Sequence, residues 1–311
     1  MTAPQDIVLL GPTCSWKSSA AIQIAKELGA EIVSCDSMQV YKGLEIGTAQ
    51  PSSEELAAVP HHLIGIFDIR EPYDVSRFLE LANAAREEIH GRGKRAVIVG
   101  GTGLYAKALV YGHALLPANA DLFEQIKAQL DAPDGRERLE EELSAVAHGR
   151  DNIPKDILLN PRRLLRAIEV ARLTGRTPWE LNSSTNTPNP EFNQFIILPD
   201  LELLKARIRQ RTAAMMAHGW VQEAQRAIGS GLMETPTARQ ALGYRDIAEF
   251  LAGNGPDSLA ELETLLVSRT IHYARRQFTW FKHQHPGATF IPISPNDNPL
   301  EKIVSTVLTT A

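Results

Sequence analysis

A short apolar run that leads into a glycine-proline pair and then a lysine-serine pair constrains this sequence most. Residues 6–10 (DIVLL) place four apolar side chains in succession, which is typical of a buried parallel strand. Residues 18–28 carry apolar side chains at helical spacing, and Gly29 is suited to end that helix. The intervening residues 11–18 (GPTCSWKS) therefore join a strand to a helix, which is the setting of a phosphate-binding loop. Such a unit favours an α/β fold.

Strands and helices continue to alternate after this unit. Short runs of apolar residues predict strands, and longer segments with apolar residues three and four apart predict helices. The order of strand, helix and strand is typical of a parallel sheet, so we predict a P-loop NTPase-like α/β core. The predicted strands are 31–34, 95–99, 195–198 and 288–293, and the predicted helices are 75–90, 201–217, 220–229, 244–252 and 258–284.

The composition of the sequence changes after about residue 112. Residues 121–182 are rich in leucine, glutamate and arginine, which predicts helices, and residues 183–190 (SSTNTPNP) predict a polar loop. We therefore predict that a helical segment interrupts the sheet-forming part of the chain. The predicted parts are a catalytic core of residues 1–112 and 191–311 and an all-helical insertion of residues 113–190.

The composition of the 311 residues is that of a globular protein, with 43% hydrophobic and 22% charged residues. No apolar stretch approaches the roughly 18 residues of a membrane span, and the N-terminus lacks the basic flank of a signal peptide. Two cysteines without metal or disulfide spacing make the cytoplasm the default location, and we expect a monomer. The net charge of -5 argues weakly against nucleic acid, but residues 201–285 carry more basic than acidic side chains.

The chemistry of residues 11–18 suits a phosphate ligand. Successive backbone N–H groups present partial positive charge, Lys17 adds a full charge, and Ser18 can place its hydroxyl on Mg²⁺. Trp16 stands where the usual pattern has glycine, so it must accept the backbone angles of that glycine at a steric cost or swing its ring outward. The alternative is a strand-to-helix turn with an incidental Lys-Ser pair. The predicted phosphate contacts are Gly11, Pro12, Thr13, Cys14, Ser15, Trp16, Lys17 and Ser18.

Polar residues follow the second predicted strand. Ligands collect at the carboxyl ends of strands in an open parallel sheet, so we expect Asp36 near the phosphate loop. There its carboxylate can bind Mg²⁺ or accept a proton from a nucleophile, and the amide of Gln39 can read the edge of a purine. The alternative is a helix cap formed by Asp36 or Ser37. Position alone supports the two interpretations about equally.

Six longer motifs are distributed over nearly the whole chain. They are DSMQVYKGLEIGTAQPS (36–52), VPHHL (59–63), VGGTGLYAKAL (99–109), NPRRLLRAIEVARLTGRTPWEL (160–181), RQALGYRDI (239–247) and SRTIHYARRQFTWFK (268–282). In this order and spacing they resemble the tRNA dimethylallyltransferase family. Trp16 departs from the usual glycine of that family and Ser18 from its more common threonine.

The resemblance implies a core like that of P-loop kinases and a helical insertion that clasps the anticodon stem-loop. It implies that Mg²⁺ assists transfer of a dimethylallyl group from dimethylallyl pyrophosphate to N6 of the adenine 3′ of the anticodon, in tRNAs reading codons that begin with U. Asp36 would be the general base, Thr13 would lie near the reacting centre, and Arg211 would clamp the pyrophosphate. The implied tRNA contacts are Asp36, Ser37, Met38, Gln39, Thr102, Arg162, Arg163, Leu164, Leu165, Arg166, Arg239, Gln240, Gly243, Tyr244 and Arg245.

Three other functions share parts of this pattern. An isopentenyltransferase of free adenine nucleotides would use the same loop and aspartate but has less need of an arginine-rich insertion. A small-molecule P-loop kinase would bind ATP and transfer a phosphoryl group. An RNA-binding protein without catalysis would result if Trp16 had ended donor binding.

Other conspicuous residues have simpler explanations. His61 and His62 lack a third ligand at metal spacing, so we expect a structural role for both. Trp280 and Phe281 could stack on bases, but we expect most aromatic residues of this segment to anchor a long helix on the core.

Overall fold

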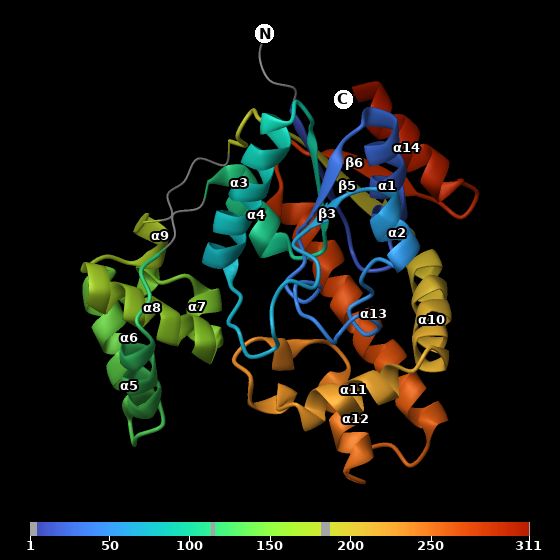
Figure 1. Ribbon diagram of the computed structural model, residues 1–311. Coiled ribbons are helices and arrows are strands. Elements are labelled where there is room, and N and C mark those ends of the chain that lie inside the picture. Colours follow the sequence, from blue (N-terminus) through green and yellow to red (C-terminus); the bar gives the residue numbers. More distant parts are fainter. Residues whose placement is uncertain (1–4, 113–115, 182–186, 311) are drawn as a thin grey trace. The chain divides into compact units, whose positions relative to one another are not determined.

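The computed structural model describes residues 5–112, 116–181 and 187–310 (Figure 1). Its packing divides the chain into a core unit, residues 1–110 with 187–311, and an insertion unit, residues 111–186. The sequence pattern predicts 113–190 for the insertion, and the first residues of the polar loop predicted at 183–190 lie outside the described residues. No helix in the described part of the chain combines the length and apolarity that a membrane span requires.

The core unit is built on one six-stranded parallel sheet with the strand order β3-β2-β4-β1-β5-β6. In its middle, Leu10 of β1 lies opposite Gly100 on one side and Ile196 on the other. All strands run in one direction, so the loops that follow them meet at one edge of the sheet. The predicted α/β, P-loop-like fold is confirmed. The strands are β1 (Asp6–Leu10), β2 (Glu31–Ser34), β3 (His61–His62), β4 (Ala96–Gly100), β5 (Phe192–Pro199) and β6 (Thr289–Ile293).

Helices cover both faces of the sheet, with α1 and α14 on one face and α3 and α4 on the other (Figure 1). The predicted helices agree with α1, α3, α10, α11, α12 and α13 to within one residue at each end, whereas α2, α4, α14 and the two-residue β3 were not predicted. The helices are α1 (Lys17–Leu28), α2 (Ser53–Ala58), α3 (Val75–Gly91), α4 (Gly103–Tyr111), α10 (Leu201–Ala217), α11 (Trp220–Gly229), η2 (Leu232–Glu234), η3 (Ala238–Gln240), α12 (Tyr244–Leu251), α13 (Leu259–Gln284) and α14 (Pro299–Thr310).

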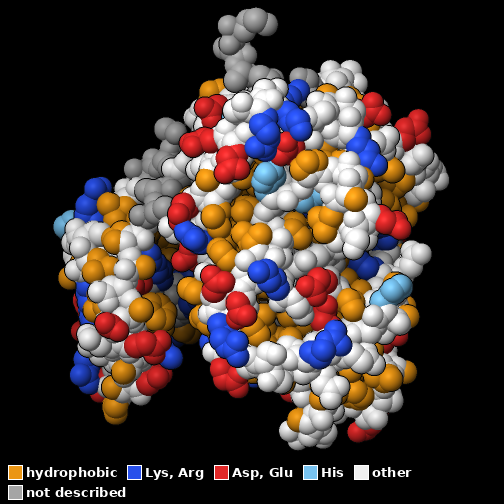
Figure 2. Space-filling model, viewed as in Figure 1, with side chains coloured by type: hydrophobic (Ala, Val, Ile, Leu, Met, Phe, Trp, Pro, Cys, Tyr) orange, Lys and Arg blue, Asp and Glu red, His pale blue; other side chains and the backbone are white. Residues whose placement is uncertain are grey.

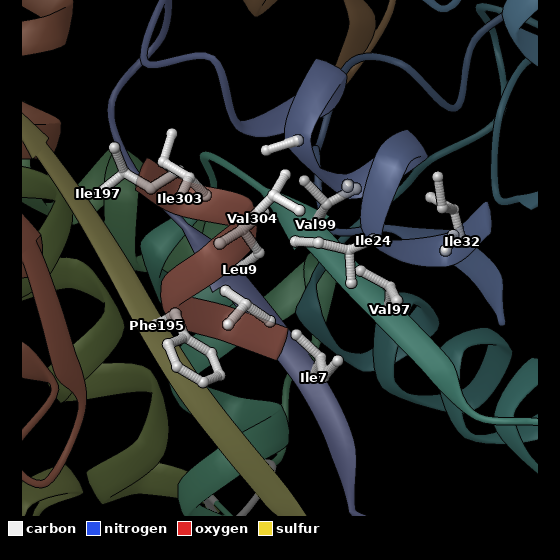
Figure 3. Packing of buried hydrophobic residues seen from close by; sticks show 14 of the residues in the cluster. Ile7, Leu9, Ile24, Ile32, Val97, Val99, Phe195, Ile197, Ile303 and Val304 are labelled. Atoms are coloured by element: carbon white, nitrogen blue, oxygen red, sulfur yellow. The ribbon is translucent and has the colours of Figure 1, made fainter. Parts of the chain in front are cut away.

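Apolar side chains from alternate positions of the sheet and from two helices form the core cluster shown in Figure 3. Ile7 and Leu9 belong to it together, because residues two apart in a strand face the same side of the sheet. Ile24 of α1 and Ile303 of α14 pack onto them, and all four side chains are fully buried. Each contributes roughly 1.5–3 kcal/mol through burial. This packing holds α1, and with it the phosphate loop, against the sheet.

The insertion unit is helical in its regular elements. Helix α8 begins after Asn160, whose side chain accepts hydrogen bonds from the backbone N–H groups of Arg162 and Arg163. Pro161 takes the first helical position, and Gly175 in the left-handed conformation ends the helix. The elements are α5 (Ala120–Leu130), α6 (Gly135–Val146), η1 (Arg150–Asn152), α7 (Lys155–Leu159), α8 (Pro161–Thr174) and α9 (Pro178–Leu181).

Candidate active site

The loop between β1 and α1 turns through two residues with left-handed backbone angles, Cys14 at φ 65° and Trp16 at φ 63°. Trp16 thus adopts the conformation that glycine would take, at a cost of roughly 1–2 kcal/mol for a residue with a Cβ. Its ring packs toward α10, where the Cζ atom of Arg207 lies 4.4 Å from the ring centroid. Of the two outcomes expected for Trp16, the structure shows the first, because the backbone accepts the glycine angles while the ring is partly buried against the core cluster and Arg207.

The other loop residues offer backbone groups more than side chains. Gly11, Pro12 and Ser15 are buried, so the Ser15 hydroxyl is not presented to a ligand. A Cβ at Gly11 would lie 2.7 Å from Ser15 Oγ and 2.9 Å from Ile197 O, which leaves room for glycine alone. Ser18 is exposed in the first turn of α1.

Two cations border this loop. Arg211, on α10, donates from Nη2 to Thr13 Oγ1 at 2.6 Å, and Lys17 donates from Nζ to the carbonyl oxygen of Pro12 at 3.3 Å. Burial lowers the pKa of Lys17 to about 8; Asp36 partly opposes this shift, and Arg211 adds to it. The loop therefore concentrates positive charge that an anion would stabilise.

Asp36 follows β2 at the same edge of the sheet. Its Oδ1 atom accepts hydrogen bonds from the backbone N–H groups of Met38 at 2.9 Å and Gln39 at 3.3 Å. Among the described residues, no hydrogen bond reaches its Oδ2 atom, which is thus free to accept a proton. The cap interpretation is right in one respect, because Asp36 caps a turn, but the next helix, α2, starts only at Ser53.

Gln277 of α13 joins the loops that follow β1 and β4. Its Oε1 atom accepts from the backbone N–H of Thr13 at 2.8 Å, and its Nε2 atom donates to Gly101 O at 2.8 Å. One residue further on, the Thr102 hydroxyl oxygen accepts from the backbone N–H of Ser37 at 3.0 Å. Gln277 was not among the predicted site residues. The sequence signal for it is a polar residue on the buried face of a long helix.

A cavity of about 70 Å³ opens where these loops meet. Thr13, Lys17, Ser18, Asp36 and Arg211 all line it, although they come from three separate segments of the chain. The cavity thus brings together two hydroxyls, a carboxylate and two cations, which can hold an anion beside a group able to take up a proton.

Gln39 also lines the cavity, and its amide is bonded to neighbouring residues. Nε2 donates to the carbonyl oxygens of Thr48 and Ala49, and Oε1 accepts from Ser34 Oγ. Both amide donors thus have partners within the core unit, while Oε1 keeps a second lone pair, so the reading of a purine edge by Gln39 stays a prediction.

Comparison with known proteins decides the family. A family model described as IPP transferase matches residues 39–284, and one described as isopentenyl transferase matches residues 5–64. The chain belongs to the IPP transferase family. The tRNA dimethylallyltransferase of Deinococcus radiodurans is 38% identical over 288 residues, which cover 91% of this chain and 92% of that protein. That of Thermus thermophilus is 38% identical and covers 92% of each chain.

Solved structures agree with this membership. The tRNA isopentenylpyrophosphate transferase of Bacillus halodurans is 31% identical, with a TM-score of 0.69 over 98% of this chain and 96% of that one. A eukaryotic dimethylallyltransferase acting on tRNA has a TM-score of 0.81 over 98% of this chain and 77% of that one, and at 23% identity it shows the shared fold. The resemblance drawn from the six motifs is confirmed.

Two residues of the insertion unit do not suit the tRNA contacts implied for them. Leu164 and Leu165 are 0% and 6% exposed and pack in the core of the insertion unit, so their side chains cannot reach RNA. Arg166 donates to the buried Glu169 at 2.5 Å and to Leu116 O at 2.8 Å, yet its side chain is 35% exposed, so its contact with tRNA stays a prediction. Arg162 and Arg163 are exposed, although Arg163 pairs with Asp156.

Two residues of the core unit, Gly243 and Tyr244, are likewise too buried for the tRNA contacts implied for them. Tyr244 is fully buried and its hydroxyl donates to Glu223 Oε1 at 2.7 Å. Gly243, at φ 90°, packs against the Trp220 ring so closely that a Cβ there would lie 2.5 Å from it. Both residues shape the start of α12. The exposed members of this motif are Arg239, Gln240 and Arg245.

The remaining conspicuous residues take part in the fold. His62 Nε2 lies 2.8 Å from Glu31 Oε2, and His61 Nδ1 lies 2.7 Å from Val59 O, so both are held at the edge strand β3. Phe281 is fully buried on α13 and Trp280 is partly buried. The contacts of His62 and Phe281 agree with the structural roles expected for them, whereas His61 also lines the cavity.

Proposed function

We propose that this protein transfers the dimethylallyl group of dimethylallyl pyrophosphate to N6 of the adenine immediately 3′ of the anticodon, in tRNAs that read codons beginning with U. The observation that carries the proposal is the cavity that the Asp36 carboxylate shares with Lys17 of the phosphate loop and Arg211 of α10. Membership of the IPP transferase family supports the choice of donor and acceptor.

The leaving group defines the role of the loop. As the bond between the allylic carbon and its oxygen breaks, negative charge grows on pyrophosphate. The backbone N–H groups of residues 14–18, Lys17 and Arg211 stabilise that charge where it develops. Thr13 is held between Arg211 and Gln277, so its hydroxyl stays beside the departing oxygen.

The acceptor needs a base. The lone pair of the adenine N6 amine is delocalised into the ring, so N6 attacks the allylic carbon effectively only as it loses a proton. Asp36 Oδ2 takes that proton, a contribution typically of order 10²–10⁴-fold. The adenine must leave its stack to reach the cavity, so we infer that the base is flipped. We assign its entry to Ser37 and Thr102, which are hydrogen-bonded to each other one residue beyond Asp36 and two beyond the cavity residue Gly100.

The residues present fit Mg²⁺ only together with the donor. No group of three or more His, Cys, Asp or Glu that could hold a metal exists among the described residues. Mg²⁺ is commonly bound by one or two protein oxygens and by substrate phosphates, and the exposed Ser18 hydroxyl lines the cavity. When bound there, the ion would offset charge on the pyrophosphate.

Exposed arginines supply the RNA contacts of the proposal. On the face drawn in Figure 2, Lys and Arg side chains are scattered among Asp and Glu and form no single basic patch. We propose that exposed arginines hold the phosphates, and that these contacts position the stem-loop without specifying its sequence. We assign this role to Arg162, Arg163, Arg239 and Arg245.

We assign the activity to a monomer in the cytoplasm. All proposed donor-site residues come from one unit of one chain. Cys14 and Cys35 are free and buried, which suits a reducing compartment.

The test is mass analysis of an anticodon stem-loop with adenine at the target position, after incubation with protein, Mg²⁺ and dimethylallyl pyrophosphate. We expect the mass to rise by one dimethylallyl group, and no rise for a stem-loop with guanine at that position. Modification of free AMP in preference to the stem-loop would favour the nucleotide isopentenyltransferase. Phosphoryl transfer from ATP would favour the kinase, and RNA binding without product would favour the non-catalytic protein.

A further inference from the structure

Position 16 carries an indole where phosphate loops have glycine, and that indole contacts a second arginine of α10. Arg207 and Arg211 are four residues apart, so they lie on the same face of the helix. Arg211 bonds to Thr13 in the loop, and the Arg207 guanidinium lies over the Trp16 ring, with its Cζ atom 4.4 Å from the centroid. Both arginines are thus tied to the phosphate loop.

The packing of α10 fixes this arrangement. Leu204 and Ile208 are buried in one apolar cluster with Cys14 of the loop and Ala274 of α13. Because this cluster sets the rotation of α10, its neighbouring positions 207 and 211 point toward the loop. Arg209, in contrast, is exposed on another side of the helix.

The cations near the loop stand outside the ion pairs of the protein. None of the ion pairs formed within the described part of the chain involves Lys17, Arg207 or Arg211. The Asp36 carboxylate attracts Lys17, whereas burial lowers the pKa of Arg207 and the neighbouring Arg211 adds to that shift. Three partly buried cations around one carboxylate leave an excess of positive charge, and a multiply charged anion relieves their repulsion.

We propose that Arg207 is a third pyrophosphate-binding cation of the donor site, and that the Trp16 ring is the platform that holds its guanidinium there. This inference rests on the proposed function. Stacking on the flat aromatic face favours one orientation of the Arg207 guanidinium over its other orientations. The side chain therefore loses less conformational entropy when it binds the anion. The indole at position 16 therefore assists donor binding instead of obstructing it.

The experiment measures binding of inorganic pyrophosphate with Mg²⁺ by titration calorimetry on the full-length protein and its variants. Arg207→Gln should weaken binding roughly tenfold, as expected for one charge-assisted contact. Trp16→Leu should weaken it less, and Trp16→Phe, which keeps an aromatic face, should restore it toward the wild type. Arg209→Gln removes the same charge from the same helix and should change nothing.

The double variant separates a platform from general packing. If Trp16 acts through Arg207, Trp16→Leu should cause no further loss in the Arg207→Gln background. A further loss of pyrophosphate affinity equal to that of Trp16→Leu alone would overturn the proposal that Trp16 is a platform for Arg207. Equal pyrophosphate affinity of Arg207→Gln and Arg209→Gln would overturn the proposal that Arg207 is a third pyrophosphate-binding cation. Arg207 is only partly buried, so its variants decide the second question even if Trp16→Leu does not fold.

The outcome also distinguishes this inference from the function on which it rests. Wild-type protein that binds no pyrophosphate and modifies no stem-loop contradicts both proposals. Wild-type protein that binds pyrophosphate and prenylates the stem-loop, with Arg207→Gln indistinguishable from it in donor KM and in pyrophosphate affinity, contradicts the inference alone. The KM for the stem-loop should stay unchanged in Arg207→Gln.

Discussion

Lys17→Met is expected to raise the free energy of unfolding of the ligand-free protein while removing its affinity for pyrophosphate. Burial lowers the pKa of Lys17 from 10.5 to about 8, because the charged ammonium group loses water on folding. The unfolded chain pays no such penalty, so folding at neutral pH must bury a charge that prefers solvent. Methionine has a similar length and no charge, and it therefore removes the penalty.

The magnitude follows from the difference between the folded and unfolded pKa values. A shift from 10.5 to about 8 corresponds to about 3 kcal/mol at pH 7. Loss of the hydrogen bond from Lys17 Nζ to Pro12 O offsets about 1 kcal/mol, which leaves a net gain of about 2 kcal/mol. Between pH 8 and 10.5 the unfolded chain binds more protons at this lysine than the folded chain does, so wild-type stability rises with pH there. The advantage of the variant should consequently shrink by about 1 kcal/mol between pH 7 and pH 9.

Urea unfolding of both proteins at pH 7 and pH 9 measures this difference, since the other titrating groups are shared and cancel. Adding pyrophosphate with Mg²⁺ should then stabilise the wild type and leave the variant unchanged. The reasoning is refuted if Lys17→Met is less stable than the wild type at pH 7, or if the gap between them does not narrow at the higher pH.

Three further predictions concern catalysis and RNA binding. Asp36→Asn should lower single-turnover prenylation by about 10²–10⁴-fold with unchanged stem-loop affinity, and near-native turnover would exclude Asp36 as the base. Arg162→Ala should weaken stem-loop binding and reduce by about one the slope of the logarithm of the binding constant against the logarithm of the salt concentration. Arg172→Ala on the same helix is the control and should leave this slope unchanged, because its guanidinium is bonded to Glu142. Equal slopes for the two variants would exclude Arg162 from the interface. Gln277→Met removes both links to Thr13 and Gly101 and should lower kcat roughly tenfold at an unchanged salt slope, while an unaltered kcat would show that the loops hold their places without it.

The fold could be predicted because its signals are local. Each central strand is a short run of buried apolar residues, and each predicted helix carries its apolar face at a spacing of three and four. The short strand β3 gave no such signal, since its two residues, His61 and His62, are only half-buried. Helix α14 was not predicted, although Ile303, Val304 and Val307 stand at the spacing of one buried helix face and are a local signal for it.

The candidate site could be predicted only in part, because a motif does not separate residues that contact a ligand from those that support them. In the motif at 160–181, Arg162 is exposed while Leu164 and Leu165 form the core of the insertion unit. In the motif at 239–247, Arg245 is exposed while Tyr244 is buried on Glu223. The residues lie side by side in the sequence, and only the burial of each side chain distinguishes their roles.

The placement of the reacting groups depends on residues far along the chain. The loops after β1, β2 and β4 carry Thr13, Asp36 and Thr102, but the hydrogen bonds that fix Thr13 come from Arg211 and Gln277, which are 198 and 264 residues away. Gln277 binds both the Thr13 N–H and Gly101 O, and the neighbouring Thr102 binds the N–H of Ser37. A movement of the phosphate loop is therefore expected to displace the turn that carries Asp36. In the proposed reaction, helices α10 and α13 therefore hold the leaving group and the base at their separation, because Arg211 and Gln277 position the loops that carry them. It follows that substitutions on the buried faces of these helices should reduce turnover more than substrate affinity, whereas exposed substitutions such as Arg209→Gln should affect neither.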